Sequence, residues 1–119
     1  MDVTGARFKP AKDGSHRLAL CGKTDRNENQ TCPSVLGLMC PVSHAGPHTI
    51  RVYGIYRKDH HGVYRPTTRA VELEAAGRLP KVRRTTPYGD QGERGGEIVH
   101  DFPVKVVCPR CRTLNEIRP

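Results

Sequence analysis

The apolar positions of this sequence fall into short runs, separated by polar segments rich in glycine and proline. One run, residues 16–20, leads into Cys21-Gly22, and a longer valine-rich run covers residues 98–107. Short apolar runs bounded by turn-forming residues are typical of β-strands. Pro103 within the second run indicates an edge position or an irregularity. The pattern therefore predicts a chain built mainly from short strands.

Residues 49–57 alternate weakly between apolar and polar positions, and a polar segment at 58–62 separates them from another apolar run at 63–65. This arrangement predicts a β-hairpin. Residues 67–76 fit two interpretations. Alternation over 69–74 favours a strand, whereas a threonine start, an alanine-rich body and Gly77 suit a short helix. We favour a strand that runs into a helical turn.

Two segments are predicted to be irregular. Residues 1–15 are polar and are expected to form a loose N-terminal arm. Residues 77–98 are rich in glycine and proline, and they predict a flexible basic loop. The remainder, from residue 16 to residue 119, is expected to form a single domain.

The composition indicates that the hydrophobic core is thin. Only 35% of the residues are hydrophobic, compared with about 45–50% in ordinary globular domains. A chain of this size with so small a core usually needs a metal, disulfides or a partner. The five cysteines are an odd number, and the N-terminus lacks the apolar run of a secretory signal. We therefore expect a reducing compartment, metal binding rather than disulfides, and no membrane span.

Residues 108–111 read Cys-Pro-Arg-Cys and follow the valine-rich run directly. Such a turn points two thiolates at one ion and supplies half of the four ligands of a structural zinc site. The best complement is the segment 32–48, which carries cysteines and histidines around a Gly-Pro pair. The candidate ligands for one or two Zn²⁺ ions are Cys21, Cys32, Cys40, His44, His48, Cys108 and Cys111.

Two groupings of these ligands remain open. In the first, Cys108 and Cys111 share one zinc with two ligands from residues 32–48, which closes a loop of about 60 residues. In the second, Cys32 joins Cys108 and Cys111, and a separate site contains Cys21, Cys40, His44 and His48. Either grouping predicts a small, mostly β, metal-stapled and loop-rich fold, zinc-ribbon-like, with at most one short helix.

Two segments resemble those of known families. Residues 40–48, Cys-x(3)-His-x-Gly-Pro-His, resemble a segment of small actinobacterial and actinophage proteins, where it follows an upstream Cys-Gly. That resemblance implies metal binding. Residues 106–115 resemble the second half of the Com-type zinc finger of phage translational regulators, in which Cys-Pro-Arg-Cys precedes a basic residue and Thr-Leu-Asn. This resemblance implies RNA binding, although the first Cys-x-x-Cys pair of that family has no counterpart here.

The net charge of +8 favours polyanionic partners. Our first hypothesis is a non-catalytic zinc-binding module that binds nucleic acid through a basic surface. Contacts of this kind are made mainly to phosphates and carry little sequence information. The candidate phosphate-binding residues are Arg78, Lys81, Arg83, Arg84, Arg110 and Arg112.

Two alternatives remain, of which the first is nearly level with nucleic-acid binding and the second is the lesser one. One is a structural or adaptor protein, such as a phage virion component or an inhibitor, that binds a protein partner and would be cytoplasmic or part of a virion. The other is an endonuclease, because residues 59–65 resemble the Asp-His-x-His…Arg motif of HNH enzymes. That resemblance implies His60 as the general base and Asp59 as a Mg²⁺ ligand. We expect no catalytic activity, and no small-molecule substrate is evident.

Overall fold

The computed structural model describes residues 3–10, 16–41, 50–52, 55–78, 97–99 and 103–118. These residues form short strands and one short helix, which confirms the predicted small, mostly β fold. The elements are β1 (Thr4–Gly5), β2 (Arg7–Pro10), β3 (His16–Leu20), β4 (Val35–Pro41), β5 (Ile50–Val52), β6 (Tyr56–Lys58), β7 (Val63–Pro66), α1 (Thr68–Ala75), β8 (Glu97–Val99), β9 (Val104–Val107) and β10 (Leu114–Ile117).

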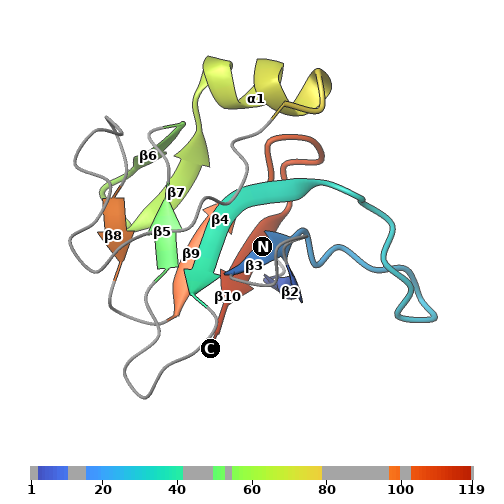
Figure 1. Ribbon diagram of the computed structural model, residues 1–119. Coiled ribbons are helices and arrows are strands. Elements are labelled where there is room, and N and C mark those ends of the chain that lie inside the picture. The colour runs from blue at the N-terminus through green and yellow to red at the C-terminus, as the bar shows by residue number, and fades with distance from the viewer. Residues whose placement is uncertain are drawn as a thin grey trace.

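The strands form two sheets with a shared core. One sheet has the order β1-β10-β9-β7-β6 and the other β2-β3-β4-β5-β8. In Figure 1 the strands β4 and β5 lie in front of β9 and β10, and α1 covers one end of the molecule. Buried residues of both sheets, including Leu36 and Leu38 on β4 and Val104 and Val106 on β9, belong to one hydrophobic cluster. The alternating pattern of these strands therefore points one face of each sheet at the other.

Strand β4 contains an irregularity where it passes β3. Leu18 pairs with Met39 and Leu20 with Val35, so the register shifts between these two pairs. Gly37 lies in the extra stretch of β4 and has a φ of 71°, a conformation that glycine adopts without steric cost. Leu36 and Leu38, on either side of this glycine, are both fully buried in the core.

Residues 68–75 form a helix, so the prediction of a strand running into a helical turn was wrong. Thr67 caps the helix, because its hydroxyl accepts a hydrogen bond from the Ala70 N–H at 3.3 Å. Gly77 follows the helix with a φ of 66°, as is usual after a helical C-terminus. The cap and stop signals were present in the sequence, and they outweigh the weak alternation of 69–74.

The predicted hairpin is confirmed, since β6 and β7 pair antiparallel around the turn at residues 59–62. The predicted strand over 49–57 is divided, because β5 belongs to one sheet and β6 to the other. The run at 98–107 is also divided, into β8 and β9, which lie in different sheets.

The N-terminal arm departs from the prediction. Residues 4–5 pair in parallel with β10, and residues 7–10 pair with β3, so much of the expected loose arm is strand. The C-terminal residues Leu114–Ile117 form β10, a strand that the pattern of apolar runs did not predict. Residues 79–96 of the expected basic loop lie outside the described residues. No helix in the described part of the chain is long and apolar enough to cross a membrane.

Candidate metal centre

Four cysteines from distant parts of the chain meet at one point between the sheets. The sulfur atoms of Cys21, Cys32, Cys108 and Cys111 all lie within 4.8 Å of one another. Cys21 and Cys111 Sγ are 3.6 Å apart, and Cys32 and Cys108 Sγ are 3.8 Å apart. These distances are far beyond an S–S bond of about 2.05 Å, and all four cysteines are unbridged. Three are buried and Cys111 is partly exposed.

The first pair of cysteines lies at the base of a loop between β3 and β4. Gln30 closes this base, because its side-chain amide donates to the carbonyl of Cys21 at 2.9 Å and to that of Cys32 at 2.8 Å. The Cys21 N–H also donates to the carbonyl of Ser34 at 3.0 Å. Cys21 and Cys32, with ten residues between them, are thereby held side by side. They present two sulfur atoms as a Cys-x-x-Cys turn would.

The second pair lies in the tight turn between β9 and β10. The Cys108 N–H donates to the Thr113 carbonyl at 2.9 Å, and the Arg112 N–H donates to the Cys108 carbonyl at 3.0 Å. The Arg110 N–H points at Cys108 Sγ at 3.4 Å. Arg112 has a φ of 64°, which closes the turn and points the chain into β10. The turn therefore presents both sulfur atoms to the same side.

Asn115 connects the two pairs. It is fully buried on β10, and its side-chain oxygen accepts a hydrogen bond from the Gly22 N–H at 2.7 Å. Its amide nitrogen donates to the Thr113 carbonyl at 3.1 Å and lies 3.7 Å from Cys21 Sγ. The Asn115 side chain thus contacts the backbone directly after Cys21, the turn that contains the second pair, and the Cys21 sulfur.

The geometry fits a tetrahedral metal ion. With Zn–S bonds of about 2.3 Å, a regular tetrahedron has S···S edges of about 3.8 Å. Two of the sulfur pairs, at 3.6 and 3.8 Å, match that edge. The four cysteines can therefore hold a metal ion with little rearrangement.

The protonation of the cluster also favours a cation. The hydrogen bond from Cys21 lowers the pKa of Cys108 to about 4, whereas the same interaction and burial raise the pKa of Cys21 well above its ordinary value. Burial raises the pKa of Cys32 to about 11. Several buried thiolates repel one another when no cation balances their charge. A divalent cation removes this repulsion, and the thiols lose their protons on binding it.

The other predicted ligands are not part of this cluster as described. Cys40 lies on β4, where its backbone pairs with Arg17, and its side chain lies outside the described part of the structure. His44 and His48 lie outside the described residues. The structure therefore joins Cys108 and Cys111 with Cys32, as both groupings allow, and adds Cys21 to the same cluster.

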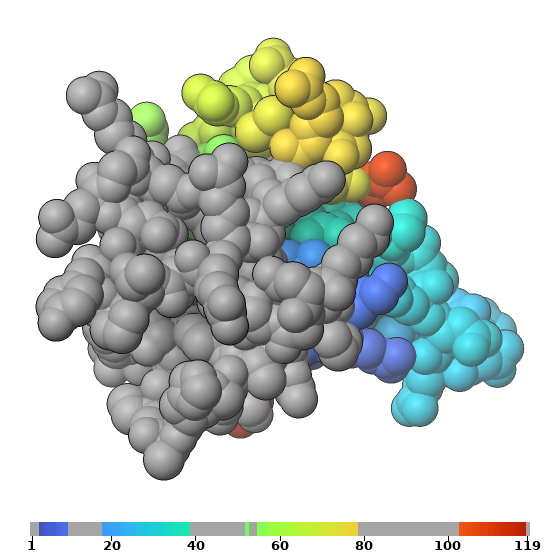
Figure 2. Space-filling view, in the orientation of Figure 1, coloured from blue at the N-terminus to red at the C-terminus, as the bar shows by residue number. Residues whose placement is uncertain are grey.

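The predicted phosphate-binding residues are placed in part. Arg110 and Arg112 extend from the cysteine turn and are exposed, and Arg78 is exposed just after α1. Arg110 Nε lies 3.0 Å from Glu74 Oε1 on α1. This contact joins the C-terminal half of the helix to the cysteine turn, and Figure 2 shows the two segments, yellow and red, against each other. Lys81, Arg83 and Arg84 lie outside the described residues.

The hairpin tip that resembles an HNH motif is organised around its own turn. Asp59 Oδ1 accepts from the N–H groups of His61 and Val63, at 2.8 and 3.0 Å, and Oδ2 pairs with Arg65 Nε at 2.8 Å. Both carboxylate oxygens are therefore used to close the hairpin. His60 and His61 are exposed, and their rings lie 4.0 Å apart. The arrangement does not favour a Mg²⁺ ligand at Asp59.

Two residues that build the centre were not found from the sequence, namely Gln30 and Asn115. Gln30 lies in a polar loop that gives no local signal of its role. Asn115 was noted only as part of the terminal motif, and its burial depends on β10, which we did not expect. No protein-family model, curated protein or solved structure matches this chain.

Proposed function

We propose that this protein is a non-catalytic zinc-binding module whose metal holds a small β scaffold together and that binds nucleic acid through basic side chains near the metal. The observation that carries the proposal is the cluster of four cysteine sulfurs within 4.8 Å of one another. Thiolates in tetrahedral arrangement select zinc or iron–sulfur clusters, and a single four-thiolate site of this size suits one zinc ion. Four protein ligands leave no open position, which is typical of a structural rather than a catalytic zinc site.

Zinc at this position would cross-link segments that are far apart in the sequence. Cys32 and Cys108 are 76 positions apart, and Cys21 and Cys111 are 90 apart. Closing loops of this length removes conformational entropy from the unfolded chain, and metal binding contributes its free energy directly to folding. A metal of this kind offsets the thin hydrophobic core, and a reducing compartment would keep the thiols available.

Nucleic-acid binding is supported by the basic edge, by which we mean Arg78, Arg110 and Arg112. These side chains are exposed and come from the end of α1 and from the cysteine turn, which the Glu74–Arg110 ion pair holds together. Arginine is suited to phosphate because its planar guanidinium donates two parallel hydrogen bonds. The resemblance of residues 106–115 to a Com-type finger adds to this reading.

Metal stoichiometry tests the first half of the proposal. Elemental analysis of the purified protein should give one zinc per chain, and Cys32→Ser should lose it while His44→Ala retains it. Cobalt substitution should give the intense charge-transfer absorption of thiolate ligands. Two zinc ions per chain, one of them lost in His44→Ala, would show a second site that includes the 40–48 segment. Absence of bound metal in protein prepared under reducing conditions would refute the proposal.

Binding to nucleic acid tests the second half. Fluorescence anisotropy with short RNA and DNA duplexes should show affinity that falls steeply between about 50 and 200 mM salt. Arg112→Gln should weaken binding to all sequences alike. If neither nucleic acid binds at the lower salt concentration and the protein instead co-purifies with one stoichiometric protein, the adaptor hypothesis replaces this one.

A further inference from the structure

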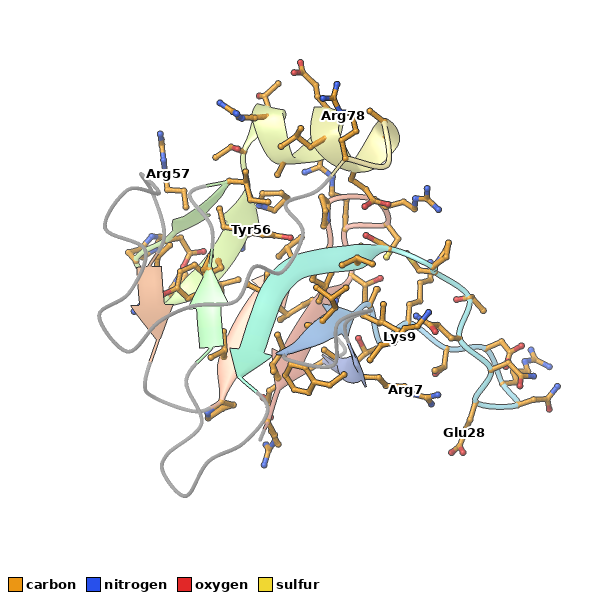
Figure 3. The ribbon with its side chains drawn as sticks, viewed as in Figure 1. Arg7, Lys9, Glu28, Tyr56, Arg57 and Arg78 are labelled. Atoms are coloured by element: carbon orange, nitrogen blue, oxygen red, sulfur yellow. The ribbon has the colours of Figure 1, made fainter. Side chains whose placement is uncertain are left out.

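Two arginines lie directly opposite each other on the β6–β7 hairpin. The register of the hairpin pairs Arg57 with Arg65, so both side chains leave the same face of the ribbon. Like charges in this position normally destabilise a strand pair. Arg65 is partly compensated by Asp59, at 2.8 Å, whereas Arg57 is exposed and has no ion pair with any described residue. Figure 3 shows Arg57 extending away from the sheets.

The paired arginines line a groove of about 400 Å³ between the hairpin and the start of α1. We call this the basic groove; its polar lining is Arg57, Lys58, Asp59, Arg65, Thr67 and Thr68. Arg57 and Arg65 face one carboxylate, which is already bonded to the turn and to Arg65. The Lys58 ammonium instead lies over the Tyr64 ring, 5.6 Å from its centroid. An anion that entered the groove would therefore meet a net positive charge.

The start of α1 adds to the positive potential of the basic groove, which comes mainly from the arginine pair. No acidic residue lies in the first turn of the helix. The hydroxyl of Thr67 is occupied by the Ala70 N–H, while the first N–H groups of a helix, here those of Thr68 and Arg69, have no partner within the helix. These groups and the positive end of the helix dipole reinforce the arginine pair at the same place.

We infer that the basic groove is a second phosphate-binding site, which takes backbone phosphates of the nucleic acid that also contacts the basic edge. The inference rests on the proposed function for the nature of its ligand. The two sites lie at opposite ends of α1, whose eight residues span about 12 Å. That length corresponds to about three to four nucleotide steps of a duplex strand. Arg69, exposed on the same helix, lies between the two sites along the chain.

The test compares charge-neutralising variants of the full-length, zinc-loaded protein. Arg57→Gln removes a groove cation that has no described ion pair, so the fold should be retained. Arg26→Gln is the matched control, because Arg26 is exposed in the loop that carries Glu28, on the far side of the molecule from Arg57 in Figure 3. Affinity for a short duplex is measured by anisotropy over a series of salt concentrations. Thr68 and Arg69 amide signals are followed by NMR while inorganic pyrophosphate is added.

We expect Arg57→Gln to weaken duplex binding about five- to fifteenfold at low salt and to reduce the salt slope by about one unit, with Arg26→Gln close to wild type. Pyrophosphate should shift the Thr68 and Arg69 signals in the wild type and less in Arg57→Gln. If Arg57→Gln binds the duplex as tightly as the wild type does, the groove is not a phosphate-binding site, and the proposed function still stands. Pyrophosphate shifts without any nucleic-acid binding would refute the proposed function and the nucleic-acid ligand, leaving an anion site for another partner such as a phosphopeptide. If the protein shows neither pyrophosphate shifts nor nucleic-acid binding, both the groove and the proposed function are refuted.

Discussion

Asn115 accepts a hydrogen bond from the backbone N–H of Gly22 at 2.7 Å, across 93 positions of sequence. Gly22 directly follows Cys21, and the Asn115 amide donates to the Thr113 carbonyl, at the end of the turn that carries Cys108 and Cys111. The same oxygen also accepts a hydrogen bond from the Thr4 hydroxyl at 3.2 Å. The two cysteine pairs are thus positioned by a buried polar contact as well as by any metal they share, which prepares the sulfur atoms for coordination.

Replacing Asn115 should weaken both folding and metal binding. Asn115→Ala leaves the buried Gly22 N–H without its acceptor, which costs about 1–3 kcal/mol in the free energy of unfolding. Loss of a side chain that orients metal ligands typically lowers metal affinity about 10- to 100-fold. Denaturant unfolding and competition with a zinc chelator measure the two effects. Asn27→Ala, in the exposed loop after Cys21, is the control and should change neither. Wild-type zinc affinity in Asn115→Ala would show that the amide does not orient the ligands.

One cysteine pair of the centre could be predicted from the sequence more easily than the other, because its two cysteines lie in one short turn. Cys108 and Cys111 are recognisable because their turn is local, and a Cys-x-x-Cys spacing has few structural alternatives. Cys21 and Cys32 are paired by Gln30 and by β3–β4 pairing, and the spacing of the two cysteines alone does not indicate this. The sequence therefore identified all four as candidates, but neither of the two groupings drawn from it joined Cys21 to Cys108 and Cys111.

The fold shows the same division between local and distant interactions. The mostly β class and the β6–β7 hairpin follow from short alternating runs and a polar turn, and they were predicted. The pairing of Thr4–Gly5 with β10 depends on residues more than a hundred positions away, and no pattern within residues 1–15 indicates it. The helix could have been predicted from Thr67 and Gly77, had the capping signals been given more weight than the alternation between them.

Gly22 should be intolerant of any side chain. A Cβ at this position would lie 1.8 Å from the carbonyl oxygen of Gly5, which is backbone and cannot move aside independently of β1. We expect Gly22→Ala to lower the free energy of unfolding by about 1–3 kcal/mol or more, because the close approach of two backbones must open. Gly5→Ala is a matched control, since a Cβ there meets nothing within 4 Å. Equal stability of the two variants would contradict the close approach.

The Glu74–Arg110 ion pair should couple α1 to the cysteine turn. Glu74 is largely buried, and burial raises the pKa of its carboxyl, while Arg110 is about half exposed. Because the arginine is solvated, we expect a coupling free energy of only about 0.5–1 kcal/mol. A double-mutant cycle with Glu74→Gln and Arg110→Gln measures it in the zinc-loaded protein. The more exposed Arg118–Glu116 pair should give a smaller coupling free energy. A larger coupling free energy for that pair would show that burial does not set the strength of these ion pairs.

Asp59 should give the hairpin an acid-sensitive turn. Its hydrogen bond with Arg65, together with the N–H groups of Val63 and His61, lowers the pKa of its carboxyl from an ordinary 3.8 to about 2. Because the folded pKa is the lower one, the stabilisation is fully present above about pH 4 and is lost as the pH falls through about 2. An NMR titration of the Asp59 carboxyl carbon should place its midpoint near 2 in the wild type. Arg65→Gln should move that midpoint back toward the ordinary value, while Arg57→Gln, which leaves the Asp59 hydrogen bonds in place, should move it much less. A wild-type midpoint near 4 would mean that the carboxylate does not hold the turn, and the hairpin would then depend on strand pairing alone.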